Sequence, residues 1–384
     1  MKYFVLTAFL TLVFAFLPLC GTQAQTPPTY SIYGLGPNTT GLGISQDGTY
    51  VTGIYYSTNA GFSNPQPGFL WTQSGGAVTL TPAGGPGYVD VSPNAVNNSG
   101  LVGGTVSTTF YGAGALPVLY SNSSSATLLP LPAGTSVGSV YGINNAGAAV
   151  GSVSQNLNWY ATVFTPTNAT VLTQTTTNNG ILQYGYGIAD SGRVTGTYIS
   201  TDGNIIGAFF LDPGATSAVD LGSLPGGSLS TIAYSISGSG RYITGASGTN
   251  AFLYQPDTAT MTAIPMPAEW SGPAGRSVNN LGWVVGSGGD FTSIPFLFDG
   301  TSTYTLQSLL TGTEASGWDM TQGNANIALG ISDNGVITGR ALYNSVTTGF
   351  VMIPNSPVPE PATWALLAVG MLIIVWVLRG KKAA

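Results

Sequence analysis

The sequence predicts an all-β protein, a seven-bladed β-propeller closed by its own N-terminal strand. Three observations give this prediction: a composition rich in glycine and poor in charge, a unit of about fifty residues that recurs seven times, and a strand-like segment ahead of the first unit. The chain has 384 residues, of which 55 are glycine and 6% are charged. Because β-branched residues suit strands and glycine suits tight turns, this mixture favours short strands over helices.

The repeat is most visible at a turn that reads Ile or Val, then Ser, Asn or Ala, two turn residues and a glycine. Self-similarity at a fixed period indicates a repeat architecture. An Asn/Asp-x-Gly turn is hairpin chemistry, because asparagine and glycine tolerate positive φ. The turn glycines stand 42 to 53 residues apart and are Gly48, Gly100, Gly147, Gly192, Gly240, Gly282 and Gly335.

Each unit contains four strand-like segments. The turn is followed by a β-branched pair that ends in glycine, such as residues 284–286. A third segment resembles Ala-Phe-Leu-Tyr at 251–254, and a short fourth one resembles Ala-Val-Asp-Leu at 218–221. Four short antiparallel strands per repeat describe a propeller blade.

The ends of the repeat array predict how the ring closes. The seventh unit ends at Met352 without a fourth strand, whereas residues 30–36 form an extra segment before the first unit. We expect this segment to complete the seventh blade, because closure removes the exposed edges that make open sheets aggregate. A linear solenoid is the alternative, but it has no use for a displaced strand.

The N-terminus predicts an export signal. Lys2 precedes an apolar stretch, and Thr22-Gln23-Ala24 supplies small residues for cleavage by signal peptidase between Ala24 and Gln25, which makes residues 1–24 a signal peptide. Lipid attachment at Cys20 is less favoured, because the preceding leucine is not the small residue a lipobox requires. Cleavage removes the only cysteine, so disulfides do not stabilise the exported domain.

The C-terminus predicts a membrane span. The 17 residues 362–378 carry no charge and span roughly 26 Å as a helix, close to the ~30 Å hydrocarbon core. The basic residues Arg379, Lys381 and Lys382 should remain cytoplasmic, which places the preceding domain on the far side. A permanent single-span anchor is one interpretation.

A short motif before the span supports a more specific interpretation. The motif, the apolar helix and the basic end together resemble the PEP-CTERM sorting signal of Gram-negative bacteria. The resemblance implies processing by exosortase, delivery to the cell surface or extracellular matrix, and an association with exopolysaccharide and biofilm production. The expected divisions are a propeller over 25–353, a linker with the motif over 354–361, and a transmembrane helix with its basic tail over 362–384; the motif residues are Val358, Pro359, Glu360 and Pro361.

The repeats themselves resemble the HAF family of extracellular repeats, in which Ile-Asn-x-x-Gly-x-Val-Val-Gly and Ala-Phe-Leu-Trp recur. Residues 221–227, Leu-Gly-Ser-Leu-Pro-Gly-Gly, match a further element of that family once. The resemblance covers nearly all of the predicted propeller. It implies an extracellular repeat domain and leaves the biochemical role open.

Charge and residue types exclude several function classes. Between residues 25 and 357, four arginines stand against thirteen carboxylates, a formal charge of −9. Nucleic acid is therefore excluded as a partner, because its backbone needs clustered lysine and arginine. The chain has no histidine, which removes Ser-His-Asp and Cys-His catalysis and histidine-bound metals. We expect no cofactor and no metal site.

Long loops on the face opposite the repeated turns carry the candidate binding residues. They place aromatic side chains near carboxylates, and flat apolar surfaces beside hydrogen-bond acceptors suit sugars. Ordinary loop packing is the alternative explanation. The candidates for ligand binding are Tyr56, Tyr111, Trp159, Tyr160, Trp270 and Trp318.

The sequence thus predicts an exported surface or matrix protein that binds polysaccharide without catalysis. One alternative is a polysaccharide hydrolase that uses a carboxylate pair drawn from Glu269, Glu314 and Asp319. A second alternative is a structural surface protein without a ligand.

Overall fold

The computed structural model describes residues 27–56, 66–108, 114–176, 179–225, 230–289, 293–323 and 326–357. The predicted signal peptide, the Pro-Glu-Pro motif and the C-terminal apolar segment lie outside the described residues. Within these ranges no helix is long and apolar enough to cross a membrane.

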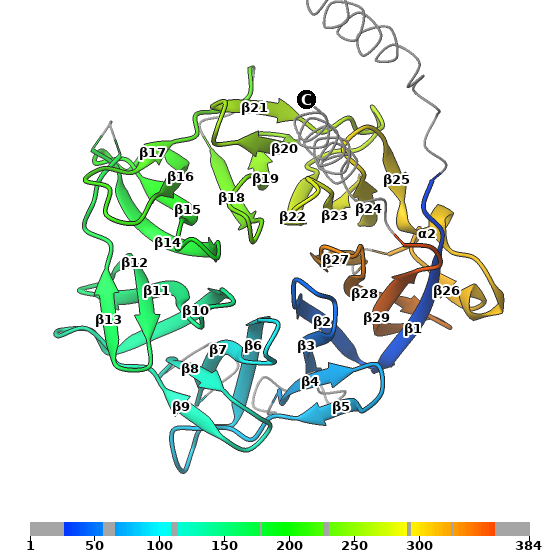
Figure 1. Ribbon diagram of the computed structural model, residues 1–384, viewed down its shortest axis with the longest axis horizontal. Coiled ribbons are helices and arrows are strands. Elements are labelled where there is room, and N and C mark those ends of the chain that lie inside the picture. Colours follow the sequence, from blue (N-terminus) through cyan, green and yellow to red (C-terminus); the bar gives the residue numbers. More distant parts are fainter. Residues whose placement is uncertain are drawn as a thin grey trace, which may run out of the picture.

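Seven antiparallel sheets stand around a common axis, each with its first strand innermost (Figure 1). Blade 1 consists of β2 (Thr39–Ile44), β3 (Tyr50–Tyr55), β4 (Gly68–Thr72) and β5 (Gly76–Thr79). Blade 2 consists of β6 (Asp90–Val96), β7 (Val102–Ser107), β8 (Leu116–Tyr120) and β9 (Ala126–Leu128). Blade 3 consists of β10 (Val137–Ile143), β11 (Ala149–Gln155), β12 (Asn158–Thr165) and β13 (Asn168–Val171).

The next three blades repeat the same order of strands. Blade 4 consists of β14 (Ile181–Ile188), β15 (Val194–Ile199), β16 (Ile206–Leu211) and β17 (Val219–Asp220). Blade 5 consists of β18 (Thr231–Ile236), β19 (Ile243–Ser247), β20 (Asn250–Gln255) and β21 (Thr260–Ala263). Blade 6 consists of β22 (Ala274–Val278), β23 (Val284–Gly288), β24 (Ile294–Phe298) and β25 (Thr303–Thr305).

Blade 7 joins the two ends of the domain, which confirms the predicted closure. Strands β27 (Ile327–Ile331), β28 (Ile337–Tyr343) and β29 (Val346–Pro354) pair in sequence, and the short β26 (Trp318–Asp319) also pairs with β28. The outermost strand is β1 (Tyr30–Pro37), antiparallel to β29 with Ile32 opposite Met352. Figure 1 shows this blue strand beside the orange-red ones. Sequence analysis did not predict the short helices α2 (Leu306–Leu309) and η2 (Thr313–Ala315) between blades 6 and 7.

The repeated turn connects the first and second strands of every blade, as predicted. All seven turn glycines adopt positive φ, between 74° for Gly240 and 88° for Gly192. This conformation suits glycine because a side chain would be strained there. The turns therefore lie together at one end of the ring, and the connections between second and third strands lie at the other.

A phenylalanine on the third strand fills the space between neighbouring blades. Five blades carry it at the equivalent position, and each of these side chains is fully buried: Phe69, Phe209, Phe252, Phe296 and Phe350. The residue opposite each one on the second strand is the glycine that ends the repeat's β-branched pair. Burying such a ring contributes roughly 1.5–3 kcal/mol per blade.

That second-strand glycine is required by the backbone of the innermost strand. In every blade a Cβ on the glycine would overlap an inner-strand carbonyl oxygen. The overlapping pairs are Gly53 with Thr40, Gly104 with Ser92, Gly151 with Ser139, Gly196 with Tyr184, Gly245 with Ile232, Gly286 with Ala274 and Gly339 with Ile327.

Replacing one of these glycines should destabilise the propeller strongly. We expect Gly245→Ala to lower the free energy of unfolding by roughly 3 kcal/mol or more, because the new methyl group must displace the backbone of β18. The matched control is Gly34→Ala in β1, where a Cβ would make only ordinary contacts at 3.6 and 3.7 Å and the cost should stay within roughly 0.5 kcal/mol. Urea unfolding followed by circular dichroism measures both, and equal losses would contradict the explanation.

Candidate functional site

Each innermost strand carries a β-bulge near its end. The pairing register with the second strand shifts at this point in all seven blades. A bulge leaves an unpaired residue and redirects its side chain. The unpaired residues occupy equivalent positions and all line one cavity on the ring axis: Leu42, Asn94, Tyr141, Tyr186, Tyr234, Arg276 and Leu329.

The cavity has two chemically different halves. Blades 3 to 6 contribute three tyrosines and an arginine, whereas blades 7, 1 and 2 contribute two leucines and an asparagine. The ring centroids of Tyr141 and Tyr186 lie 5.4 Å apart, and those of Tyr186 and Tyr234 lie 6.0 Å apart. The Arg276 guanidinium carbon lies 4.3 Å from the centroid of Tyr234. We call the group formed by Tyr141, Tyr186, Tyr234 and Arg276 the aromatic half.

A stack of rings extends from the aromatic half toward the end of the propeller opposite the repeated turns. Tyr184 is nearly parallel to Tyr186, with centroids 5.8 Å apart and an interplanar angle of 7°. Trp159 stacks in turn on Tyr184 at 5.8 Å. Trp159 stands next to the hairpin that joins β11 and β12, so the stack runs from this hairpin to the ring axis.

Tyr184 and Tyr186 both have a raised pKa, so their phenols stay neutral to a higher pH than an ordinary tyrosine. Burial above all, together with the neighbouring phenols of Tyr141, Tyr184 and Tyr234, raises the pKa of Tyr186 to about 12, and a hydrogen bond with Thr197 partly offsets this rise. Burial and Tyr141 also raise the pKa of Tyr184. At neutral pH the aromatic half therefore offers uncharged hydroxyl donors and acceptors beside flat apolar rings.

The repeated turns form a closed ring of hydrogen bonds at the other end of the axis. A backbone N–H in each turn donates to the turn of the next blade. The seven links are Asp47 N to Asn98 Oδ1 (3.0 Å), Asn98 N to Asn145 Oδ1 (2.9 Å), Asn145 N to Asp190 Oδ1 (2.9 Å), Asp190 N to Gly238 O (2.9 Å), Ser239 N to Asn280 Oδ1 (2.7 Å), Asn280 N to Asp333 Oδ1 (2.8 Å) and Asp333 N to Gln46 O (2.7 Å).

The side chains in this ring explain why Asn and Asp recur in the turns. Five links end on a side-chain oxygen of Asn or Asp. In the other two turns Gln46 and Gly238 occupy the position, and the backbone carbonyl accepts instead. The carboxylates of Asp190 and Asp333 therefore connect neighbouring blades, beyond any role within their own turns.

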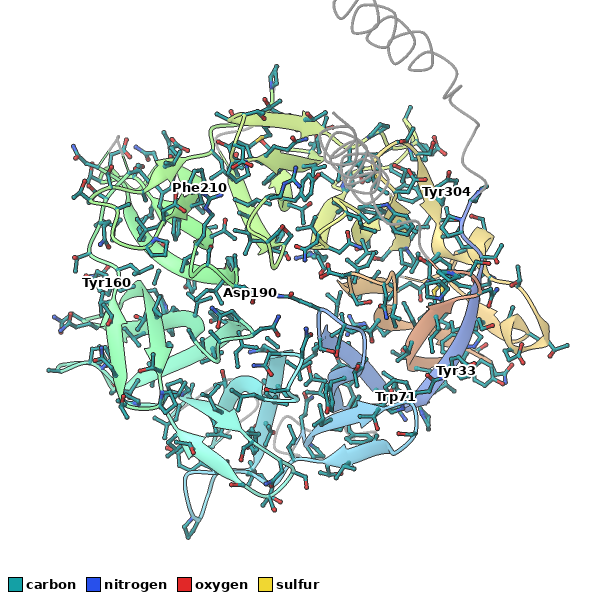
Figure 2. All side chains as sticks on the ribbon, in the orientation of Figure 1. Tyr33, Trp71, Tyr160, Asp190, Phe210 and Tyr304 are labelled. Atoms are coloured by element: carbon teal, nitrogen blue, oxygen red, sulfur yellow. The ribbon has the colours of Figure 1, made fainter. Side chains whose placement is uncertain are left out.

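One side chain crosses the axis at this end. Gln46 of blade 1 donates from Nε2 to Asp190 Oδ1 of blade 4 at 3.4 Å, and a Cβ on Gly238 of blade 5 would overlap the same amide. Asp190 lies beside the central opening in Figure 2. The turn end of the axis is therefore obstructed, which makes the hairpin end the more direct entry for a ligand.

Asp190 and Asp333, two of the three carboxylates in the repeated turns, already have hydrogen-bond partners on both oxygens. Asp190 accepts from the backbone and side-chain nitrogens of Asn145, and Asp333 accepts from those of Asn280. Burial raises the pKa of Asp333, the hydrogen bonds from Asn280 oppose this rise, and Asp190 adds to it.

The three carboxylates predicted for a hydrolase lie in other surroundings. Glu269 and Glu314 are exposed. Asp319 accepts hydrogen bonds from Thr321 and Gln322, and these bonds lower its pKa, the opposite of what a general acid needs. Among the described residues, no group of three or more Cys, Asp or Glu could hold a metal ion.

The six aromatic residues predicted from loops have different environments. Trp159 joins the aromatic stack, whereas its neighbour Tyr160 packs against the apolar core and lies toward the outside of its blade (Figure 2). The Tyr56 hydroxyl accepts a hydrogen bond from Arg340 at 2.6 Å. Of the remaining three, Trp270 packs beside Phe296, and Tyr111 lies outside the described residues. The third is Trp318.

Trp318 requires a correction. Only 7% of its surface is exposed, because its ring packs against Tyr343 and Phe350 in the core of blade 7. It therefore offers no stacking surface to a ligand. Sequence position alone had suggested an exposed loop, but the residue belongs to β26 and pairs with β28.

Four tyrosines and an arginine at this site were not predicted from the sequence: Tyr141, Tyr184, Tyr186, Tyr234 and Arg276. A signal for most of them was present, because four of them stand two positions before the Ile or Val of the repeated turn. Reading that column of the repeat would have shown aromatic or basic residues in four consecutive blades. Whether those side chains face the ring axis, however, depends on the bulge.

Comparisons with known proteins support the targeting and the fold. Residues 357–382 match the PEP-CTERM protein-sorting motif. The chain is therefore an exported protein, processed by exosortase and sorted to the surface of a Gram-negative bacterium, on a propeller scaffold. No curated protein matches the chain.

Solved structures of other proteins share the architecture. An oligogalacturonate lyase in complex with manganese aligns with a TM-score of 0.51 and 14% identity, over 87% of this chain and 97% of the other. An oligogalacturonate lyase from Vibrio parahaemolyticus gives 0.48 and 11%, over 88% and 95%. TolB from Acinetobacter baumannii gives 0.45 and 11%, over 82% and 65%, so the chain spans less than two thirds of that protein. At 14% identity, the likeness to the manganese-bound lyase shows the fold alone.

The partly buried carboxylate of Asp333 in the turn ring gives a pH prediction. Because the folded state raises the pKa of Asp333, the proton binds the folded chain more tightly than the unfolded one. The stability from this group is present below its unfolded pKa of about 3.9 and is lost as pH rises through the folded pKa.

Wild-type protein should therefore lose stability relative to Asp333→Asn as pH rises from about 3.5 to 7, since the amide does not titrate. Urea midpoints of the two proteins across this range measure the difference. A constant difference, or a wild type that gains relative to the variant with rising pH, would contradict the assignment.

Proposed function

We propose that this exported protein binds polysaccharide without cleaving it, and that the binding site is the aromatic half of the central cavity with the stack leading to Trp159. The supporting observation is the continuous run of rings from the β11–β12 hairpin to the axis. Aromatic faces pack against the C–H faces of sugar rings, while the phenol hydroxyls supply hydrogen bonds. The proposal keeps the ligand class predicted from the sequence and places the site inside the ring instead of on the loops.

The size of the cavity suggests which part of the ligand it receives. Its volume is about 180 Å³, less than the ~300 Å³ at the lower end of pockets for drug-sized ligands. The cavity therefore suits the terminal group of a longer saccharide. The adjoining units of the chain would lie along Tyr184 and Trp159 toward the hairpin end.

A carboxylate-dependent hydrolase is the second candidate, because Asp333 has a raised pKa and Asp190 acts on it electrostatically. Asparagine donors already occupy both carboxylates. This arrangement favours a structural role over the exchange of protons with a substrate. The PEP-CTERM motif, which places the protein outside the cell, is compatible with either function.

The full-length chain, purified in a detergent without a sugar headgroup, provides the test. Calorimetric titration with tetrasaccharides of glucose, N-acetylglucosamine, glucuronate and mannuronate measures binding, and a reducing-sugar assay on the same samples measures cleavage. Binding of one or more of these probes without new reducing ends supports the proposal. New reducing ends, or no binding of any probe, would overturn it.

The side chain of Tyr186, which contacts both Tyr141 and Tyr234 in the aromatic half, should control affinity. We expect Tyr186→Leu to weaken saccharide binding about tenfold, because one stacking surface and one hydroxyl are lost while an apolar side chain is retained. Tyr33→Leu on β1 is the matched control, since Tyr33 is 42% exposed and lies on the outer strand of blade 7 (Figure 2). Equal affinities of both variants and the wild type would place the site elsewhere.

A further inference from the structure

We infer that the central cavity selects an acidic saccharide by binding a sugar carboxylate at Arg276, an inference that rests on the proposed function. The described residues include four arginines with different surroundings. Arg193 forms an ion pair with Asp212 at 2.6 Å, Arg340 donates to Tyr56, and Arg241 is exposed. Arg276 is the arginine that lines the cavity.

The guanidinium of Arg276 is held in place without a partner for its charge. Its Nε is buried and makes no hydrogen bond, and within the described residues no carboxylate lies within ion-pair distance of it. A buried donor left unsatisfied costs about 1–3 kcal/mol, more for a charged group. Such a cost in a native structure calls for an explanation, which a ligand, an ordered water or local strain can supply.

Two features of the backbone and the neighbouring ring position this side chain. Arg276 is the unpaired residue of the bulge in β22, so its direction is set by the strand. Tyr234 of the preceding blade lies against the guanidinium, with its ring centroid 4.3 Å from the central carbon. Contact of this kind uses the π-electron face of the ring and leaves N–H donors of the guanidinium for a planar acceptor.

The charges in the cavity favour a single negative charge on the ligand. Arg276 and Asp333 are the two formally charged side chains in the lining. The Asp333 carboxylate already accepts two hydrogen bonds from Asn280, so it does not serve as the partner of the arginine. One guanidinium matches a carboxylate in charge and in planar geometry, whereas a phosphate monoester carries close to two charges and would be poorly balanced beside Asp333.

The ligand class is therefore a uronic acid or a comparable carboxylate-bearing sugar at the end of a saccharide chain. The carboxylate would contact Arg276 while the pyranose ring lies against Tyr186 and Tyr234. The two leucines and the asparagine of the opposite half provide no second cation. Neutral sugars should therefore bind the same rings more weakly than acidic ones.

The test compares a mannuronate tetrasaccharide with its methyl ester, which keeps the sugar rings and removes the charge. Full-length protein in sugar-free detergent is titrated with each. We expect the acid to bind about tenfold or more tightly than the ester, and Arg276→Gln to lose about 10- to 100-fold in affinity for the acid with little change for the ester. Arg276→Lys should retain part of the preference, because it keeps the charge without the planar fork.

Arg241→Gln is the matched control. It removes an arginine that also lies over a tyrosine, at 5.8 Å from the Tyr242 centroid, but outside the cavity lining. Thermal unfolding of each variant shows whether a loss of affinity reflects loss of the fold, and the retained binding of the ester by Arg276→Gln gives a second check.

The outcomes separate the two proposals. Equal binding of acid and ester, unaffected by Arg276→Gln, would overturn the assignment of Arg276 and leave saccharide binding intact. If the protein binds neither this pair nor any tetrasaccharide of the wider set, both proposals are wrong. A preference for the acid that disappears in Arg276→Gln and persists in Arg241→Gln supports both.

Discussion

The central cavity depends on one backbone contact that every blade repeats. A carbonyl of the innermost strand lies where the second-strand residue would carry its Cβ, and only glycine leaves that space open. The inner strand bulges two residues after this carbonyl, and the bulged residue faces the axis. The glycine that ends the repeat's β-branched pair therefore permits the bulge in the inner strand, and the bulge directs a side chain into the cavity.

A second repeated feature keeps the seven inner strands in a fixed arrangement. Each turn donates a backbone hydrogen bond to the next, and the ring closes from Asp333 of blade 7 to Gln46 of blade 1. The pairing of β1 with β29 closes the same blade at its outer edge. The cavity is thus bounded by a ring of hydrogen bonds at the turn end, and the innermost strands of the seven separate sheets form its wall. Such preorganisation reduces the entropy that binding would otherwise cost.

On this regular scaffold the cavity-lining residues break the symmetry. Four consecutive blades present Tyr141, Tyr186, Tyr234 and Arg276, and the other three present leucine and asparagine. A purely structural ring has no need of an arginine that, among the described residues, forms no ion pair with a carboxylate, whereas recognition of an acidic sugar does. The domain carries a formal charge of −9 between residues 25 and 357, so as a whole it repels anions. Arg276 is unusual because it places a positive charge in the cavity lining.

The sequence by itself determined the seven blades, the turns and the closing strand. A repeat of fixed period indicates a repeat architecture, and the strand missing from the last unit must be supplied by the extra segment before the first. It also determined export through the motif at 357–382. The turn glycines were also predictable, because the need for positive φ is a local property of the turn. Tertiary structure alone decided which aromatic residues meet. Trp318 and Trp159 look alike in sequence, yet packing buries one and stacks the other on Tyr184. The bulges arise from contacts between strands, and no local pattern records the direction in which they turn a side chain.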